Sequence, residues 1–467
     1  MTFDHLLFLF SFLPALLLVH AVTPAKYRQR VLIVASLFFY LLASPEFLLL
    51  FIFSLLLNSL FGWIILNQQT SRRVSRLCLF TGVLFNVGML ALYKYWNFAA
   101  SNFSRITGIG IATQTLLLPL GLSFFTFKAI SYLADAYKGE ITSFRLEQTV
   151  LYLSFFGQIQ SGPIARYETF APVKRVESSL FNAGCVRFMI GFSKKVLIAD
   201  VLYNIVTEVF DTTGMQSTSM VWLASVCYSL QLFYDFSGYS DMAIGICSMF
   251  GYPCPENFNY PYMTKSLSEF WRRWHITLGV WFRNYIYIPM GGSRVPRLRL
   301  YLNLLTVWAL TGIWHGANWN FVVWGLVYFV LLALEKTLNI PKRLNGWMPR
   351  TLYRCIILLI INFQWVVFRS SDLTTGLQML KSMVVYTGDA ASNARTLFLL
   401  QDYGAFLLIA VIFCMPVVQW INSVCQKSKA ANTAYQIVFG CTVCAAFIAA
   451  LSFVVSGQSN PFLYGNF

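Results

Sequence analysis

Apolar runs recur from one end of the chain to the other, separated by short polar or basic stretches. A run of about 20 apolar residues is long enough to cross the hydrocarbon core of a bilayer as a helix. Residues 47–66 and 77–95 form two such runs. The pattern therefore predicts an all-α, polytopic membrane protein. Because no long polar linker interrupts the pattern, we expect one membrane domain over residues 1–467.

Basic residues indicate which connecting loops face the cytoplasm, because Lys and Arg are enriched on that side of membrane proteins. Residues 26–30 and 72–76 contain such clusters, and between them two apolar runs are joined by the turn Ser44-Pro45-Glu46. The first apolar run, residues 6–19, has no basic residue before it. We therefore expect an uncleaved first span with its N-terminus outside.

Two later apolar runs contain polar interruptions. One covers residues 151–163, and the other covers residues 221–252 with Asp235 and Asp241 near its middle. Broken helices at membrane depth are tolerated only where protein or a water-filled cavity surrounds them. We therefore expect both runs to be broken helices. For the two carboxylates, a catalytic role and a polar cross-link between helices are both open.

The composition agrees with a membrane protein, since 57% of the residues are hydrophobic and only 11% are charged. Soluble domains contain about 25% charged residues. The net charge is +16, but the basic residues are spread among short loops, which favours contact with the headgroups of the lipid bilayer and argues against nucleic-acid binding. The ten cysteines are dispersed, and the CxxC pair Cys441 and Cys444 lies in an apolar run with no second ligand pair nearby. Neither His275 nor His315 has a Cys or His partner at metal-ligand spacing, so we expect no metal site.

Two of the four histidines, His275 and His315, lie in tryptophan-rich runs inside apolar sequence. An ionisable residue at membrane depth is costly and is a functional-site hypothesis by default. Imidazole also titrates nearer neutral pH than any other side chain. Hydrogen-bonded packing is the alternative role for both. Catalysis is favoured at His315, because Gly316 would let a substrate approach the backbone and Trp314 would exclude water.

The segment around His275 has the apolar spacing of one amphipathic helix over residues 267–285. Its three arginines are too many for a lipid-facing span, so this helix should lie along the cytoplasmic side of the membrane or dip into it. Glu269 and Arg273 are four residues apart and should form an ion pair.

The segment around His315 is apolar over residues 301–334, which is too long for one span, and basic residues flank both ends. This pattern predicts a hairpin with its apex at residues 316–318. His315 would then lie deep in the membrane or towards the far side, and His275 towards the cytoplasm. We therefore expect two separate points on a path through the membrane rather than one catalytic dyad.

The chain contains a series of motifs, namely Leu118-Pro-Leu-Gly-Leu-Ser-Phe-Phe-Thr-Phe127, Phe233-Tyr-Asp-Phe-Ser-Gly-Tyr-Ser-Asp-Met-Ala-Ile-Gly245, Glu269-Phe-Trp-Arg-Arg-Trp-His-Ile-Thr-Leu278, Tyr285-Ile-Tyr-Ile-Pro-Met-Gly-Gly292, Trp314-His-Gly316 and, as a weaker match, Pro461-Phe-Leu-Tyr464. These motifs resemble those of the membrane-bound O-acyltransferases, and most closely the bacterial alginate O-acetyltransferase branch. The resemblance implies a ring of about eleven transmembrane helices with re-entrant segments. It also implies that His315 is essential for acyl transfer and that His275 is a second family marker. Asn284 departs from the pattern, because relatives often have an acid there.

The resemblance implies a multi-pass enzyme of the bacterial inner membrane that passes an acetyl group from a cytoplasmic thioester, such as acetyl-CoA, for O-acetylation of an extracytoplasmic polysaccharide of the alginate or cellulose type. It also implies a periplasmic, SGNH-type acetyltransferase partner and a polysaccharide biosynthesis complex. Acyl transfer to a peptidoglycan or teichoic-acid-type cell-wall polymer is the first alternative. A polysaccharide or solute transporter is the second, because broken helices and buried charges suit transport equally well.

Acyl transfer requires a base that takes the proton of the acceptor hydroxyl, and this role is assigned to His315. His275 would orient the donor or relay a proton. The basic candidates would hold donor phosphates, with membrane anchoring as their alternative role. The residues considered for substrate binding are Lys265, Arg272, Arg273, Trp314, Asn318 and Asp241.

Overall fold

The computed structural model describes residues 1–67, 69–114, 116–173, 176–212, 217–388 and 390–463, with the side chains of 390 and 391 left out. Tyr464 of the weaker tail motif lies outside these residues. Within them the secondary structure consists of helices and contains no strand, which confirms the all-α prediction. The described residues form two compact units, Met1–Phe188 with Ser240–Glu256, and Met189–Tyr239 with Asn257–Leu463. One membrane domain over the whole chain stays a prediction.

Six described helices are long and apolar enough to cross a membrane. This finding agrees with a multi-pass membrane protein, whereas a ring of about eleven helices stays a prediction. The first predicted span corresponds to a shorter apolar helix, Phe8–Val22. The six candidate spans are Pro45–Leu66, Arg72–Thr107, Trp319–Arg343, Trp347–Arg369, Ser392–Phe413 and Lys429–Val455.

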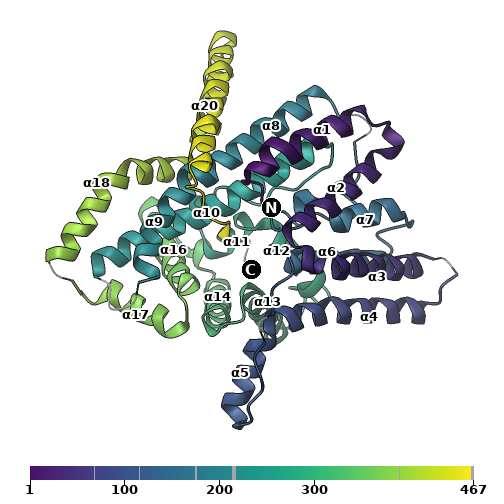
Figure 1. Ribbon diagram of the computed structural model, residues 1–467. Helices are drawn as coiled ribbons and strands as arrows, with labels where there is room; N and C mark the ends of the chain where they lie inside the picture. The colour runs from purple at the N-terminus through teal and green to yellow at the C-terminus, as the bar shows by residue number, and fades with distance from the viewer. Residues whose placement is uncertain (68, 115, 174–175, 213–216, 389, 464–467) are drawn as a thin grey trace. The chain divides into compact units, whose positions relative to one another are not determined.

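In the first unit, α3 and α4 lie side by side (Figure 1). Their contact contains a buried amide pair, in which Asn58 Nδ2 donates to Asn86 Oδ1 over 3.3 Å and Asn86 Nδ2 donates to Asn58 Oδ1 over 2.8 Å. Reciprocal bonds of this kind satisfy polar groups between apolar helices. The helices of this region are α1 (Leu13–Val22), α2 (Arg28–Ala43), α3 (Leu48–Leu66), α4 (Arg72–Leu90), α5 (Trp96–Thr107), α6 (Leu122–Lys138), α7 (Leu146–Ser154) and α8 (Ser178–Ser193), of which the last continues into the second unit.

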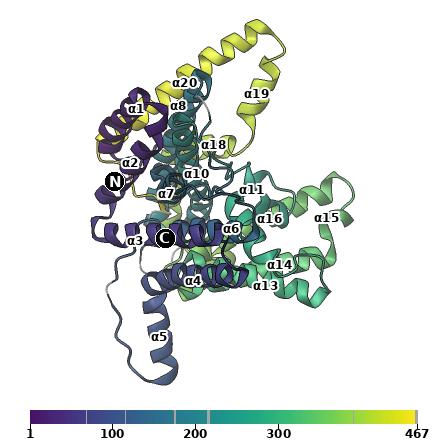
Figure 2. The same cartoon turned by 90° about the vertical axis from the view of Figure 1, so that its right-hand side faces the viewer.

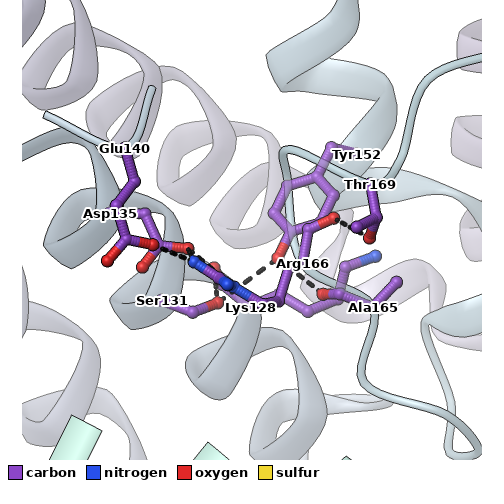
Figure 3. A network of polar contacts seen from close by, with 8 residues as sticks. All are labelled: Lys128, Ser131, Asp135, Glu140, Tyr152, Ala165, Arg166 and Thr169. Atoms are coloured by element: carbon purple, nitrogen blue, oxygen red, sulfur yellow. Dashed lines mark hydrogen bonds and ion pairs between the residues drawn. The ribbon is translucent and has the colours of Figure 1, made fainter. Parts of the chain in front are cut away.

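The predicted break in residues 151–163 is confirmed. Helix α7 ends at Ser154, and the chain is irregular up to Ala165 apart from one short 3₁₀ turn, although every residue of 155–165 is buried. Tyr152 Oη donates to the carbonyl of Ala165 over 2.9 Å, and Arg166 pairs with Asp135 of α6 at 3.1 Å (Figure 3). Protein groups therefore bond to this irregular backbone and to the charge beside it, as a broken segment at membrane depth requires.

The predicted break at residues 234–241 is wrong, because α10 is a continuous helix over Thr218–Met249. In the second unit Asp235 pairs with Lys195 at 3.1 Å, and in the first unit Asp241 pairs with Arg187 at 2.6 Å. Since a cation faces each carboxylate, the helix does not have to unwind to supply backbone donors. Both aspartates thus form polar cross-links between segments of the chain.

In the second unit, α13 and α14 form the predicted hairpin and lie side by side (Figure 2). A Cβ at Gly312 would lie 2.5 Å from the carbonyl oxygen of Phe321, and one at Gly325 would lie 2.4 Å from that of Trp308. These glycines therefore permit the close helix contact. The helices of this unit, besides its part of α10, are α9 (Asp200–Phe210), α11 (Leu267–Arg273), α12 (Ile276–Phe282), α13 (Arg297–His315), α14 (Trp319–Leu338), α15 (Ile340–Arg343), α16 (Trp347–Arg369), α17 (Leu373–Val384), α18 (Ala390–Phe413), α19 (Val417–Cys425) and α20 (Lys429–Val455).

Candidate active site

A cavity of about 190 Å³ lies in the second unit, and both His275 and His315 line it. Its wall comes from the segment of α11 and α12, the π-helical turn that follows them, and α13. The wall is mostly aromatic and aliphatic, with Arg283 and Thr311 among its polar members. The sequence predicted two histidines at separate points on a path. The structure instead brings both to one cavity.

The helix predicted over residues 267–285 is broken at His275, so that prediction is wrong. His275 has φ 45°, in the left-handed region that few residues other than glycine adopt. The backbone carbonyl of Asn257 accepts from Ile276 N over 2.9 Å, and its side-chain Oδ1 accepts from Thr277 N over 3.3 Å and from Thr277 Oγ1 over 2.9 Å. Asn257 therefore supplies acceptors to the first amides of α12, which allows the chain to turn there.

Asn257 also orients the His275 ring. Its Oδ1 lies 3.1 Å from His275 Nδ1, and the two donors of Thr277 fix the amide with this oxygen towards the imidazole. The neutral ring therefore carries its proton on Nδ1, and Nε2 is the basic nitrogen. His275 lies outside the six candidate spans, and burial lowers the pKa of its imidazole to about 3. The ring is consequently neutral at neutral pH.

His315 is the last residue of α13 and is buried, with 4% of its surface exposed. Its ring is edge-on to Trp324 of α14 and to Phe368 of α16, with ring centroids 5.1 Å apart in each pair. Trp314 lies 4.8 Å from His315 and 6.2 Å from His275, again between ring centroids. Aromatic rings thus cover His315 on several sides and link it to His275, while His315 also lines the cavity.

Gly316 has a packing role in the structure. A Cβ at this position would lie 2.2 Å from the ring of Phe321, while the glycine backbone itself is extended. The missing side chain therefore lets Phe321 pack over the apex of the hairpin. The predicted approach of substrate to this backbone stays a prediction.

The basic candidates do not line the cavity. Lys265 and Arg272 are exposed. Arg273 donates to Glu269 from Nε over 3.0 Å and from Nη2 over 2.8 Å, which confirms the predicted ion pair. It also donates to a backbone carbonyl at Asn259 over 3.1 Å. The geometry therefore gives Arg273 a structural role, and donor binding by the three residues stays a prediction.

Asn318 and Asp241 are also absent from the wall of the cavity. Asn318 caps α14, because its Oδ1 accepts from Trp319 N over 2.7 Å, while its Nδ2 donates to the carbonyl of Ser371 over 2.8 Å. Asp241 belongs to the first unit, where it pairs with Arg187. Their described contacts are those of structural residues.

Three residues beside the histidines had no sequence signal strong enough to name them. Asn257 contacts His275 from 18 positions away, so no local spacing marks it. Arg283 and Thr311 line the cavity, but the first was counted only as a charge of the predicted helix and the second only as part of an apolar run. Among the described residues, no group of three or more His, Cys, Asp or Glu could hold a metal ion.

The part of the chain that contains the cavity is similar to known proteins. The model of "MBOAT, membrane-bound O-acyltransferase family" matches residues 47–368. The probable alginate O-acetylase AlgI of Azotobacter vinelandii is 36% identical over 88% of this chain and 84% of its own length. The peptidoglycan O-acetyltransferase of Helicobacter pylori is 32% identical over 100% of this chain and 97% of its own length. The teichoic acid D-alanyltransferase of Bacillus subtilis is 29% identical over 55% of this chain and 68% of its own length.

Proposed function

The chain belongs to the membrane-bound O-acyltransferase family, and from this premise we propose that it transfers an acetyl group from a cytoplasmic thioester for O-acetylation of an extracytoplasmic polysaccharide of the alginate or cellulose type. One observation carries the proposal. Two histidines line a single cavity with aromatic walls, inside the region that the family model matches. Base catalysis in a site that excludes water is what acyl transfer from a thioester requires.

In the proposed reaction, His315 takes the proton of the acceptor hydroxyl while the acceptor oxygen forms a bond to the acyl carbon. The carbon–sulfur bond then breaks, and the imidazolium returns the proton to the leaving thiolate. General base catalysis of this kind contributes about 10²–10⁴-fold in rate. The rings of Trp324 and Phe368 around His315 limit hydrolysis of the donor. The neutral ring of His275, with Nε2 as its basic nitrogen, is assigned to orienting the donor or relaying the proton.

Acetyl-CoA is the proposed donor. A cavity of about 190 Å³ is smaller than the range of about 300–1,000 Å³ typical of ligand sites, so it suits the acyl-thioester end rather than a whole coenzyme. Arg283 lines the cavity and is exposed, so it is assigned to binding a phosphate of the same molecule outside the cavity by charge-assisted hydrogen bonds. Lys265 and Arg272 remain candidates for the outer part of the donor.

The proposed location is the bacterial inner membrane, with the donor on the cytoplasmic side. The polymer lies on the other side, so a periplasmic acetyltransferase of the SGNH type and a polysaccharide biosynthesis complex are the proposed partners. The support is the similarity to the probable alginate O-acetylase of Azotobacter vinelandii over most of both chains.

Peptidoglycan is the second candidate acceptor. The peptidoglycan O-acetyltransferase of Helicobacter pylori aligns with the whole of this chain, with 97% of its own length covered. The match to the teichoic acid D-alanyltransferase of Bacillus subtilis covers only 55% of this chain, and therefore supports a teichoic acid acceptor less.

Labelled acetyl-CoA given to the purified protein in lipid nanodiscs tests the donor, with release of free CoA as the readout. Mass spectrometry of exopolysaccharide and peptidoglycan from a deletion strain tests the acceptor. The proposal expects thioester consumption and the loss of acetyl groups from the exopolysaccharide. Loss from peptidoglycan alone would establish the second candidate, and transport without thioester consumption would refute acyl transfer.

A further inference from the structure

The structure contains a buried carboxylate that the proposed reaction does not use, that of Glu335 near the end of α14. Its side chain is buried, with 4% of the residue surface exposed. Glu335 Oε2 accepts from the backbone N–H of Leu267 and from Tyr353 Oη, each over 2.7 Å. Oε1 accepts from the backbone N–H of Ser268 over 3.0 Å and also from the hydroxyl of Ser268. These hydrogen-bond donors are all neutral.

Two of these donors are the first amides of α11. The first amides of any helix have no partner within the helix, and they form the positive end of its dipole. In α11 the next amide, at Glu269, bonds to the cap residue Ser266 over 3.1 Å. A helix of only seven residues has little stability of its own. Its placement therefore depends on contacts with other elements. The hydrogen bonds that the buried Glu335 carboxylate accepts at its N-terminus are strong contacts of this kind.

Helix α11 leads directly to the cavity. Its Trp271 lines the cavity and packs edge-on against Trp308 of α13, with ring centroids 4.9 Å apart, and against Tyr328 of α14, at 4.8 Å. His275 follows two residues after the helix ends. A shift at the N-terminus of α11 would therefore move the walls of the cavity and His275 together.

The carboxylate joins three elements at one point, because its partners come from α11 and α16 while Glu335 itself belongs to α14. The same three elements meet again beside the cavity. There the ring of Trp271 of α11, which lines the cavity, lies 5.7 Å from Trp324 of α14 and 6.3 Å from Trp365 of α16, between ring centroids. Phe368 of α16 lies 5.1 Å from His315, so α16 contacts both α11 and the residue that ends α13.

We propose that Glu335 is a positioning residue, whose carboxylate holds the N-terminus of α11 and thereby sets the placement of His275 relative to His315. The inference rests on the proposed acyl transfer. A misplacement of about 1 Å, caused by a change far from the chemistry, can cost about 10²-fold in rate. The carboxylate acts on the geometry of the site and touches neither donor nor acceptor.

The test is Glu335→Gln in the full-length protein, assayed with acetyl-CoA and acceptor. Glutamine has the same shape, but its NH₂ group donates and would face a donor of α11 or α16. We expect kcat to fall about 10-fold or more while the KM for acetyl-CoA changes less than about 3-fold, because Arg283, the proposed phosphate ligand of the donor, lies outside α11. Tyr353→Phe removes one donor and leaves the carboxylate. It should lower kcat about 2–5-fold, and it provides the test if the glutamine variant does not accumulate.

The matched control is Asp372→Asn. Asp372 caps α17 in the same unit, where its Oδ1 accepts from Thr375 N over 2.9 Å, and α17 does not line the cavity. Both variants remove a carboxylate from a helix N-terminus and should lower thermal stability. Only Glu335→Gln should lower kcat and speed hydrogen exchange at residues 267–274.

Equal loss of kcat in the two variants, or unchanged kcat in Glu335→Gln, would overturn the positioning role while the wild type still transfers acetyl groups. A wild type that transfers none would refute the proposed function itself. In that case the hydrogen-exchange experiment still tests whether Glu335 holds the N-terminus of α11. Unchanged protection of α11 in Glu335→Gln would refute that role.

Discussion

Asn257 and His275 form one structural pair, because Asn257 both holds the turn of the backbone at the histidine and fixes its ring. Asn257 Oδ1 lies 3.1 Å from His275 Nδ1 and also accepts from the hydroxyl of Thr277 over 2.9 Å. The left-handed φ of 45° at His275 costs of order 1–3 kcal/mol and persists only where neighbours enforce it. The contact therefore links a strained backbone to the tautomer of a cavity-lining imidazole.

Asn257→Asp should make activity depend on pH. In the wild type, burial holds the pKa of His275 at about 3, so its ring stays neutral between pH 5 and 8. A carboxylate at position 257 favours the imidazolium and raises that pKa. Activity of the variant should therefore show an added decline as the pH falls through the raised pKa, a step from His275 that the wild type does not have. Rate measurements from pH 5 to 8 check this, and parallel profiles would contradict the assigned role.

Arg283→Ala should weaken binding of the donor more than it slows the chemistry. Both arginines are exposed, but Arg283 lines the cavity and Arg272 does not. We expect the KM for acetyl-CoA to rise about 10-fold in Arg283→Ala and less than about 2-fold in the control Arg272→Ala. Acetyl-pantetheine, which lacks phosphate, should show little difference between Arg283→Ala and the wild type. An equal rise for both donors would exclude phosphate binding by Arg283.

Asp241→Asn should affect stability rather than turnover. Asp241 pairs with Arg187 at 2.6 Å in the first unit, and Arg187 also contacts Glu256. The side chain of Arg187 is 35% exposed and keeps Glu256 as an ion-pair partner at 2.7 Å, so replacing Asp241 removes only part of its charge compensation. The melting temperature in detergent should fall, while kcat per folded molecule stays within about 2-fold of the wild type. A large loss of kcat at unchanged stability would instead support the predicted role of Asp241 in substrate binding.

Gly325→Ala should disrupt the hairpin that ends in His315. A Cβ at Gly325 would lie 2.4 Å from the carbonyl oxygen of Trp308, whereas one at Gly404 of α18 would meet nothing within 4 Å. We therefore expect much less folded protein for Gly325→Ala. The control Gly404→Ala should change stability by about 1 kcal/mol or less, in the stabilising direction. Detergent-solubilised yield measured by size-exclusion chromatography checks both, and equal yields would show that the close helix contact is dispensable.

Local patterns predicted the features that depend on neighbouring residues. Basic residues at both ends and a polar centre identified the hairpin around residues 316–318, and the spacing of four identified the pair of Glu269 and Arg273. For features that depend on partners far away in the sequence, the predictions were wrong or absent. The turn at His275 requires Asn257. Likewise α10 stays helical at Asp235 because Lys195, from another part of the chain, faces it at 3.1 Å. Spacing along one element contains no information about such partners.

The assignment of His315 as the catalytic base is tested most directly by the acetyl-transfer rate of His315→Ala in lipid nanodiscs, with the amount of protein in the membrane determined in parallel. The matched control is His5→Ala, which changes an exposed histidine outside the cavity. We predict a loss of about 10²-fold or more for His315→Ala at normal protein levels and wild-type activity for His5→Ala. Full transfer activity in His315→Ala would contradict the claim that this residue is the base.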